Sequence, residues 1–345
     1  MFSYTFKMTV TTIICLCLLV LCLINPTSSL NGAISGIMLC GNVIIPSLFP
    51  FCAIALFAFK SGVTGFLSRL LDGVSRKLFH QSGEQFCVFL MSFLAGYPVG
   101  IRLINELAEQ KKITSEQAKR MGLYCVNAGP AFILVAVGEG ILHDRALGII
   151  LFLGNLIATV LLAIITEFSS KPPIYVKNEL EANIGDSFVE SVAQAATSVF
   201  GICAWVILFS ALLSALKCKF IPNFIYAPIS YACEVTNGVI FARRNLLMVA
   251  AILSFGGFSV HCQFYSIGKK NAPPYLKFLL FRAFHAALSA AFVYLLLMLS
   301  GKTVTTFSNG VEPIRQNISF TVAGAISLML MSIFLISSTQ YEKKK

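Results

Sequence analysis

Long apolar segments separated by short polar ones are the dominant pattern along this chain. A helix needs about 20 predominantly apolar residues to cross the hydrocarbon core of a membrane. Segments of that kind predict eight crossings, at 8–26, 33–59, 121–142, 146–167, 188–216, 246–268, 276–299 and 318–338. The pattern therefore predicts an all-α polytopic membrane protein.

Two further apolar segments, 85–106 and 220–242, are interrupted in the middle by residues typical of turns. The first contains GYPVG at 96–100, and the second contains TNG at 236–238. Glycine and asparagine tolerate positive φ angles, and proline lacks a backbone donor. Each half is then about 10 residues, or about 15 Å of helix, which reaches only the middle of a membrane. We therefore expect two re-entrant hairpins.

Basic residues before and after each hairpin support this interpretation. The clusters lie at 60–77 and 111–120 around the first hairpin, and at 217–219 and 243–244 around the second. Cytoplasmic loops are enriched in Lys and Arg, and crossings at these places would make both faces equally basic. With two hairpins and eight crossings, most basic residues fall on one side. That side is predicted to be cytoplasmic, with both termini inside, although the second hairpin's cluster falls outside.

Composition agrees with a membrane protein and removes other classes. Of the 345 residues, 57% are hydrophobic and 12% are charged, against about 25% charged in an average soluble domain. Soluble, disordered and nucleic-acid-binding classes are excluded by these values. The net charge of +11 is assigned to cytoplasmic loops. The cysteines lie mostly in apolar runs without a CxxC pair, so we expect packing roles for them.

The N-terminal segment allows two interpretations. Lys7 precedes an apolar run from Met8 to Ile24, as in a signal peptide. The small residues that follow, from Pro26 to Ser29, lack a clean A-x-A cleavage site. We therefore favour an uncleaved first span.

The order of crossings and hairpins repeats within the chain. Residues 33–167 contain a crossing, a hairpin and two crossings, and residues 187–300 contain the same series. The two series begin on opposite sides of the membrane, which predicts an inverted-topology repeat like those of many secondary transporters. Residues 1–32 form the N-terminal span, 168–186 a polar cytoplasmic linker, and 301–345 a loop, a final span and a basic tail.

Each half also contains a helix that is broken in mid-span, at NAGPAF (127–132) and at SFGGF (254–258). Backbone inside a membrane must satisfy its own hydrogen bonds, so broken helices are tolerated mainly where they line a cavity. Ordinary kinks are the alternative for any single break. The two hairpin tips and the two broken helices together make four breaks in matching positions of the two halves. These favour a transport site near the midplane. Half-helix N-termini there favour anionic or carbonyl-bearing solutes.

Three runs of residues resemble a known family. IPSLFPF (45–51), AGYPVGIR (95–102) and NAGPAF (127–132) resemble the YlbJ-type sporulation integral membrane proteins of the nucleoside-recognition, or Gate-domain, group. The resemblance covers about residues 33–300. It implies two re-entrant hairpins and two broken helices, similar to concentrative nucleoside transporters. It also implies a role in the outer forespore membrane, where the family is associated with moving dipicolinic acid from mother cell to forespore.

Candidate solute-binding residues lie at the hairpin tips and helix breaks. They are Gly96, Tyr97, Pro98, Gly100, Arg102, Asn127, Gly129, Pro130, Glu234, Asn237, Gly238, Gly256, Gly257 and His261. A charge inside the membrane is costly unless it is paired or hydrated. Arg102, close to the first tip, either binds a solute carboxylate or pairs with Glu106. Glu234 either serves a coupling cation or a proton, or caps the second arm of its hairpin.

The uncharged candidates leave similar alternatives. The amides of Asn127 and Asn237 either contact the solute or an ion, or cap local backbone. His261 follows the second break and is either a proton relay or a hydrogen-bonded packing residue.

Enzymatic chemistry is not expected, because no nucleotide loop, metal-ligand cluster or nucleophile–base set is visible. We expect no cofactor. We predict a secondary transporter or facilitator of a small anionic aromatic solute, dipicolinic acid first, that works by alternating access. A cation-coupled nucleoside transporter and a non-transporting sporulation scaffold are the alternatives. The expected partners are the solute and the lipid of a bacterial cytoplasmic or outer forespore membrane, without nucleic acid, and a homo-oligomer is left open.

Overall fold

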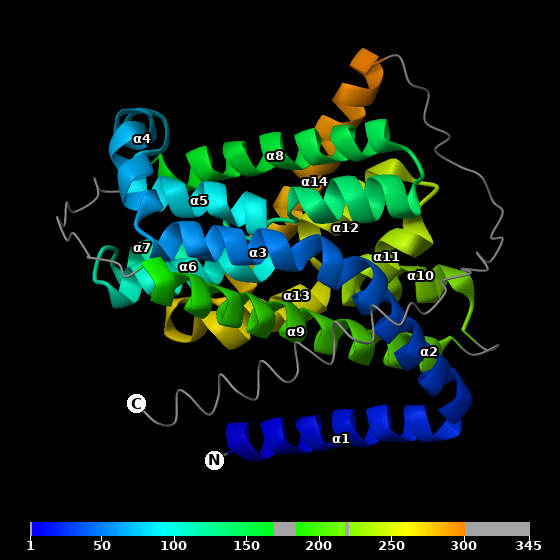
Figure 1. Cartoon of the computed structure of the whole chain (residues 1–345). Coiled ribbons are helices and arrows are strands. Elements are labelled where there is room, and N and C mark those ends of the chain that lie inside the picture. The colour runs from blue at the N-terminus through cyan, green and yellow to red at the C-terminus, as the bar shows by residue number, and fades with distance from the viewer. Residues whose placement is uncertain (1, 169–183, 218–220, 301–345) are drawn as a thin grey trace.

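A computed structural model describes residues 2–168, 184–217 and 221–300, which form helices without a β-strand among them (Figure 1). The all-α expectation is confirmed for these residues. In chain order the elements are α1 (Phe2–Ile24), α2 (Pro26–Leu39), the π-helix η1 (Cys40–Ile44), α3 (Ile45–Lys60), α4 (Val63–Phe79), α5 (Gly83–Ala95), α6 (Tyr97–Glu109), α7 (Ser115–Met121), the π-helix η2 (Ala131–Ile141), α8 (Arg145–Glu167), α9 (Ile184–Leu216), α10 (Asn223–Cys233), α11 (Val235–Ala242), α12 (Leu246–Phe255), α13 (Gly257–Gly268), the 3₁₀-helix η3 (Lys269–Asn271) and α14 (Tyr275–Ser300).

Five helical stretches in the described part are long and apolar enough to cross a membrane. They are Pro26–Lys60, Arg145–Glu167, Ile184–Leu216, Leu246–Asn271 and Tyr275–Ser300. These stretches coincide with five of the expected crossings. The crossing expected at 8–26 corresponds to the shorter apolar helix Met8–Ile24 of α1, and the one expected at 318–338 lies outside the described residues.

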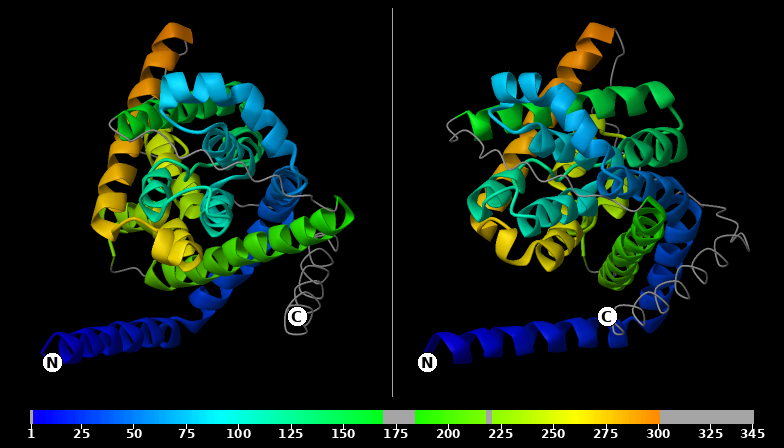
Figure 2. Two further views of the ribbon diagram at one scale, coloured as in Figure 1. Left: turned by 90° about the vertical axis from the view of Figure 1, so that its left-hand side faces the viewer. Right: turned by 60° about the vertical axis from the view of Figure 1, so that its left-hand side comes forward.

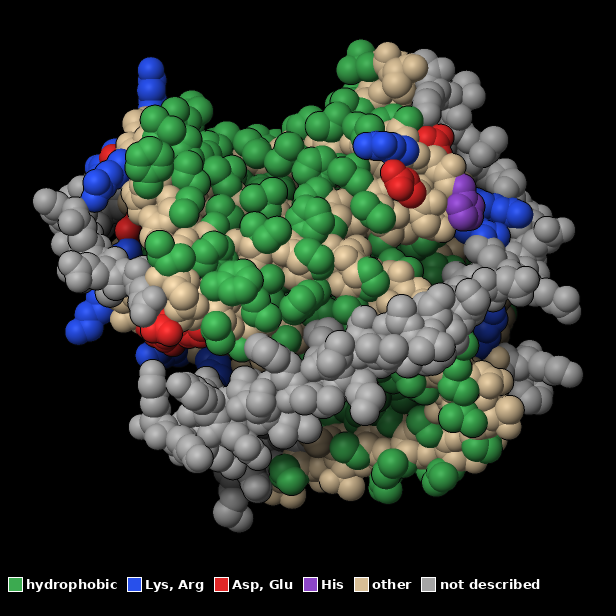
Figure 3. Space-filling model, in the orientation of Figure 1, with side chains coloured by type: hydrophobic (Ala, Val, Ile, Leu, Met, Phe, Trp, Pro, Cys, Tyr) green, Lys and Arg blue, Asp and Glu red, His purple; other side chains and the backbone are tan. Residues whose placement is uncertain are grey.

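The surface has the character of a membrane protein. On the face shown in Figure 3, apolar side chains cover the middle of the molecule, and charged side chains gather toward two opposite ends. Large apolar side chains such as Leu280 and Phe284 of α14 are exposed as well. An apolar belt between charged ends is the surface that a bilayer covers. Figure 2 shows α1 at the periphery of the bundle.

The third element of the first half is not one continuous helix. After α7 ends at Met121, residues 122–129 are non-helical, and the chain resumes as the 11-residue π-helix η2. The break expected at NAGPAF within the crossing 121–142 is therefore confirmed, and the non-helical segment already begins at residue 122. Pro130 contributes to it, because the residue before a proline avoids the helical conformation.

The first hairpin forms as expected. Ser82 starts α5 with a capping box, in which its hydroxyl accepts from the Gln85 backbone N–H. Gly96 separates α5 from α6 with φ of 84° and ψ of −173°, a conformation that favours glycine. Pro98 lies in the first turn of α6, where its missing N–H has no cost. The two arms return to the same end of the molecule (Figure 1).

The second hairpin turns earlier than expected. The helix ends at Cys233, Glu234 is extended with φ of −146° and ψ of 130°, and α11 begins at Val235. The TNG run at 236–238 therefore lies in the first helical turn, and its prediction as the turn is wrong. The reason is that the Glu234 side chain caps α11 by accepting from the Asn237 backbone N–H at 2.7 Å.

The broken helix of the second half also matches its prediction. Gly256 and Gly257 have φ of 87° and 66° between α12 and α13. Residues other than glycine rarely adopt such positive φ angles, so this pair of glycines is required for the break. The hairpins occupy opposite ends of the molecule in Figure 1. The inverted repeat, its boundaries and the likeness to nucleoside transporters stay predictions.

Single-cysteine labelling checks the hairpin topology. In a cysteine-free background, Glu116→Cys in α7 should react with a membrane-impermeant maleimide from the cytoplasmic side. Arg244→Cys, between α11 and α12, should react from the opposite side, because both residues are exposed at opposite ends of the fold. Labelling of both positions from the same side would contradict the paired hairpins.

Candidate functional site

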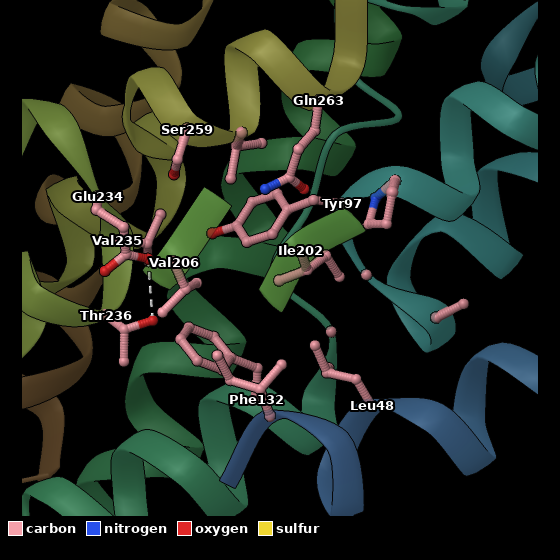
Figure 4. Close-up of a pocket in the computed structure, with 16 residues that line it drawn as sticks. Leu48, Tyr97, Phe132, Ile202, Val206, Glu234, Val235, Thr236, Ser259 and Gln263 are labelled. Atoms are coloured by element: carbon pink, nitrogen blue, oxygen red, sulfur yellow. Dashed lines mark hydrogen bonds between the residues drawn. The ribbon is translucent and has the colours of Figure 1, made fainter. Parts of the chain in front are cut away.

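The hairpin tips and the helix breaks meet at a pocket (Figure 4). Four parts of the fold frame the pocket: the first tip, the second tip, the break before η2 and the first turns of α13. The empty volume of the pocket is about 480 Å³ when the solvent at its open side is included. Its narrow interior has room for only about two water molecules. Its lining includes Ala95, Gly96, Tyr97, Pro98, Gly129, Phe132, Glu234, Val235, Thr236, Ser259, Val260 and Gln263.

The opposite wall of the pocket is apolar and lies near the middle of a long helix. Ile202 and Val206 of α9 and Ile44 and Leu48 of η1 and α3 complete the lining. Because α9 runs from Ile184 to Leu216, its two lining residues lie close to mid-length. The pocket is therefore at about mid-depth of the crossing.

Some of the predicted residues line this pocket, and the others do not. Gly96, Tyr97, Pro98, Gly129 and Glu234 are in the lining. The remaining candidates are absent from it. They are Gly100, Arg102, Asn127, Pro130, Asn237, Gly238, Gly256, Gly257 and His261.

Three polar lining residues were missed from the sequence, besides apolar ones. Ser259 and Gln263 lie four residues apart in α13 and so share a helix face, and Thr236 lies beside Glu234. The signal was present, because Ser259 and Gln263 are polar positions at helical spacing inside an otherwise apolar segment. It identifies a polar stripe but not the cavity that the stripe faces.

Glu234 is both a helix cap and part of the pocket wall. One carboxylate oxygen accepts from the Asn237 backbone N–H at 2.7 Å and from its side-chain amide at 3.0 Å. The other accepts from the Thr236 hydroxyl at 3.1 Å. The capping alternative is therefore observed. Asn237 also donates to the Ser210 hydroxyl at 2.8 Å, which ties the tip to α9.

Arg102 lies away from the pocket. Its Nε is buried and has no hydrogen-bond partner among the described residues. Glu106, its expected partner, instead lies 3.5 Å from the ammonium of Lys60, which is also 3.0 Å from Glu190. Recognition of a carboxylate by Arg102 stays a prediction, and the pocket geometry lends it no support.

Gly100 has a packing role. A Cβ at this position would overlap the backbone carbonyl of Cys125. Helix α6 therefore approaches the non-helical segment before η2 more closely than any side chain would allow. A bulky residue here would disturb the fold before it reached a solute.

The buried cation at the centre of the fold is Arg282 of α14, which is 0% exposed. Its guanidinium donates to the backbone carbonyls of Val126 at 2.7 Å and Phe255 at 3.3 Å. Val126 lies in the non-helical segment of the first half, and Phe255 is the last residue before the glycine pair of the second. One side chain thus satisfies carbonyls at both helix breaks, where a membrane offers no water.

A chain of hydrogen bonds continues from Arg282. A guanidinium only donates, so His285 Nδ1, 3.0 Å away, accepts. The proton of the neutral ring is then on Nε2, which lies 2.8 Å from the Thr159 hydroxyl. Thr159 in turn lies 2.9 Å from the Asn127 side-chain oxygen. This chain of hydrogen bonds fixes α14, α8 and the non-helical segment before η2 relative to one another.

Asn127 ends that chain with its side chain fully used. Its amide nitrogen donates to the Ser92 hydroxyl at 3.2 Å and to the Tyr124 carbonyl at 3.0 Å. The residue is buried. The observed contacts fit its local capping alternative.

His261 is packed among aromatic rings. Its Nε2 lies 3.1 Å from the Phe255 carbonyl, while Nδ1 has no partner in the described part of the chain. The rings of Phe255 and Phe278 lie about 5 Å from the imidazole. The observed surroundings fit its packing alternative.

The electrostatics of the lining are simple. It holds the carboxylate of Glu234 and no Lys or Arg side chain among the described residues. The first turns of α6, α11 and α13 contribute to the wall, and helix N-termini carry partial positive charge. No group of three His, Cys, Asp or Glu side chains in the described ranges could hold a metal ion.

Over 319 residues the chain is 25% identical to the sporulation integral membrane protein YlbJ of Bacillus subtilis (strain 168), an alignment that covers 79% of this chain and 78% of that protein. The predicted resemblance to YlbJ-type proteins is confirmed, whereas membership of the Gate-domain group stays a prediction. No protein-family model and no solved structure matches the chain. The similarity to an integral membrane protein and the apolar helices of this chain together indicate that it is an integral membrane protein.

Replacing Arg282 tests its bridging role. Arg282→Met should lower the free energy of unfolding by about 3 kcal/mol, because two buried carbonyls and a histidine lose their donor. The measurement is the thermal unfolding midpoint of the purified protein in detergent. Lys277→Met, an exposed position on the same helix, is the control and should be near wild type. Equal stability of both variants would contradict the role.

Proposed function

We propose that this YlbJ-type chain moves a small planar solute across a membrane during sporulation, with dipicolinic acid as the first candidate. The observation that supports transport is the meeting of two hairpin tips and a broken helix at one mid-depth pocket. Irregular backbone at membrane depth is expected where it borders a solute path. The sporulation setting rests on the similarity to YlbJ.

The narrow interior of the pocket is consistent with alternating access. Its interior has room for about two water molecules and not for an aromatic ring. Solute passage therefore requires the tips to separate from the apolar wall on α9. A carrier that opens to the two sides of the membrane in turn is expected to have such a narrow interior between its outward and inward states.

Charge in the pocket separates the two transport candidates. The N-termini of α6, α11 and α13 favour an anion such as dipicolinate. The Glu234 carboxylate and the absence of a basic side chain from the described lining favour the second candidate, a cation-coupled carrier of a neutral nucleoside. Both solutes contain a planar aromatic ring, although the ribose of a nucleoside is not planar.

Filling the pocket tests transport against a scaffold role. Val206→Phe adds bulk to a buried lining position, so it should reduce dipicolinate accumulation in forespores at least tenfold without loss of membrane abundance. Leu208→Phe on the same helix points away from the core at an exposed position and should behave as wild type. Normal dipicolinate and normal spores with Val206→Phe would leave the scaffold as the better account.

Glu234→Gln distinguishes the two solutes. The Gln oxygen can still accept from the Asn237 N–H, so the cap persists while the charge is lost. Binding of the dipicolinate dianion should then strengthen several-fold, because a like charge is removed. Binding of a nucleoside with a coupling cation should weaken. Isothermal titration of the purified protein with dipicolinate and with uridine measures both, with Glu116→Gln as the exposed control.

A further inference from the structure

Gln263 has a buried side-chain oxygen that no described residue satisfies. The residue is 5% exposed and lines the pocket beside Tyr97 (Figure 4). Its Oε1 has no hydrogen-bond partner, and its amide makes no side-chain hydrogen bond to another described residue. Buried polar groups are nearly always paired, so an unpaired amide at a cavity wall indicates a ligand.

The hydroxyls of Tyr97 and Thr236, two neighbouring polar groups of the lining, already have hydrogen-bond partners. The Tyr97 hydroxyl donates to the Leu253 carbonyl at 2.5 Å, and the Thr236 hydroxyl donates to Glu234. The Tyr97 ring is therefore held in place with its apolar surface in the lining. Gln263 differs from these groups because its hydrogen-bonding capacity is unused.

The chemistry of an amide defines what it recognises. Gln263 presents a donor and an acceptor side by side, whichever way its terminal group is turned. The matching partner is an edge with an adjacent acceptor and donor, as in a carboxylic acid, a carboxamide or a nucleobase edge. A fully ionised carboxylate offers acceptors only and satisfies half of the pair.

We propose that Gln263 binds the solute through paired hydrogen bonds to such a donor–acceptor edge, while the solute ring packs on Tyr97. This assignment rests on the proposed function and narrows its substrate class. For dipicolinic acid it selects a form with a protonated carboxyl group over the dianion. That choice agrees with the Glu234 carboxylate and the lack of a basic side chain in the described lining.

Two neutral probes test the pairing. Pyridine-2,6-dicarboxamide carries the donor–acceptor edge, and dimethyl dipicolinate carries acceptors only. Isothermal titration of the purified full chain in lipid nanodiscs should show that the wild type binds the dicarboxamide about tenfold more tightly than the diester. Gln263→Leu should remove that preference. Gln194→Leu, the same change on α9 outside the lining, should retain it.

The outcomes separate this assignment from the function it rests on. A wild type without the preference, or a Gln263→Leu protein that keeps it, would overturn the role of Gln263 while the Val206→Phe result still upholds transport. Failure of the wild type to bind dipicolinate, uridine or either probe would overturn both proposals. If Gln263→Leu lowers abundance, Gln263→Met, which keeps the length of the side chain, replaces it and should lose the preference equally.

Discussion

One buried guanidinium makes the two broken helices of this fold compatible with a membrane. A break frees backbone carbonyls, and lipid offers them no hydrogen bond, so each free carbonyl must find a donor within the protein. Arg282 supplies donors to Val126 and Phe255 from a third helix. The bond to His285 and onward to Thr159 then orients the elements around the first break. The tips and breaks that border the pocket depend on this arrangement.

The walls of the pocket differ in how they are held. On one side Tyr97 is fixed to the Leu253 carbonyl, so the first tip is tied to the helix that precedes the second break. On the other side Leu48, Ile202 and Val206 contribute apolar contacts. Dispersion contacts lack direction and allow sliding, whereas hydrogen bonds to carbonyls do not. The second tip is also tied to α9 by the hydrogen bond from Asn237 to the Ser210 hydroxyl, so movement along the apolar wall has to break that bond.

Local chemistry in the sequence predicted the positions of the breaks but not the groups that stabilise them. Gly96 and Gly256 were identifiable because a glycine inside an apolar segment indicates a possible positive φ angle, and both residues have one in the structure. The second turn was placed wrongly because the cap comes from the Glu234 side chain, an uncommon residue for that role. Arg282 has no periodic signal that reveals its carbonyl partners, since these are 27 and 156 positions away in the chain.

Glu234 joins the structure of the second tip to the chemistry of the pocket. The same two oxygens that cap α11 also border the cavity. A cation or proton that reached them would compete with the Asn237 N–H and the Thr236 hydroxyl for their lone pairs. A cation or proton bound to the carboxylate would therefore weaken the first turn of α11. A strong cap would in turn disfavour binding of that cation or proton. Ion binding at Glu234 would therefore be linked to the integrity of this tip through shared atoms, without any need for a distant relay.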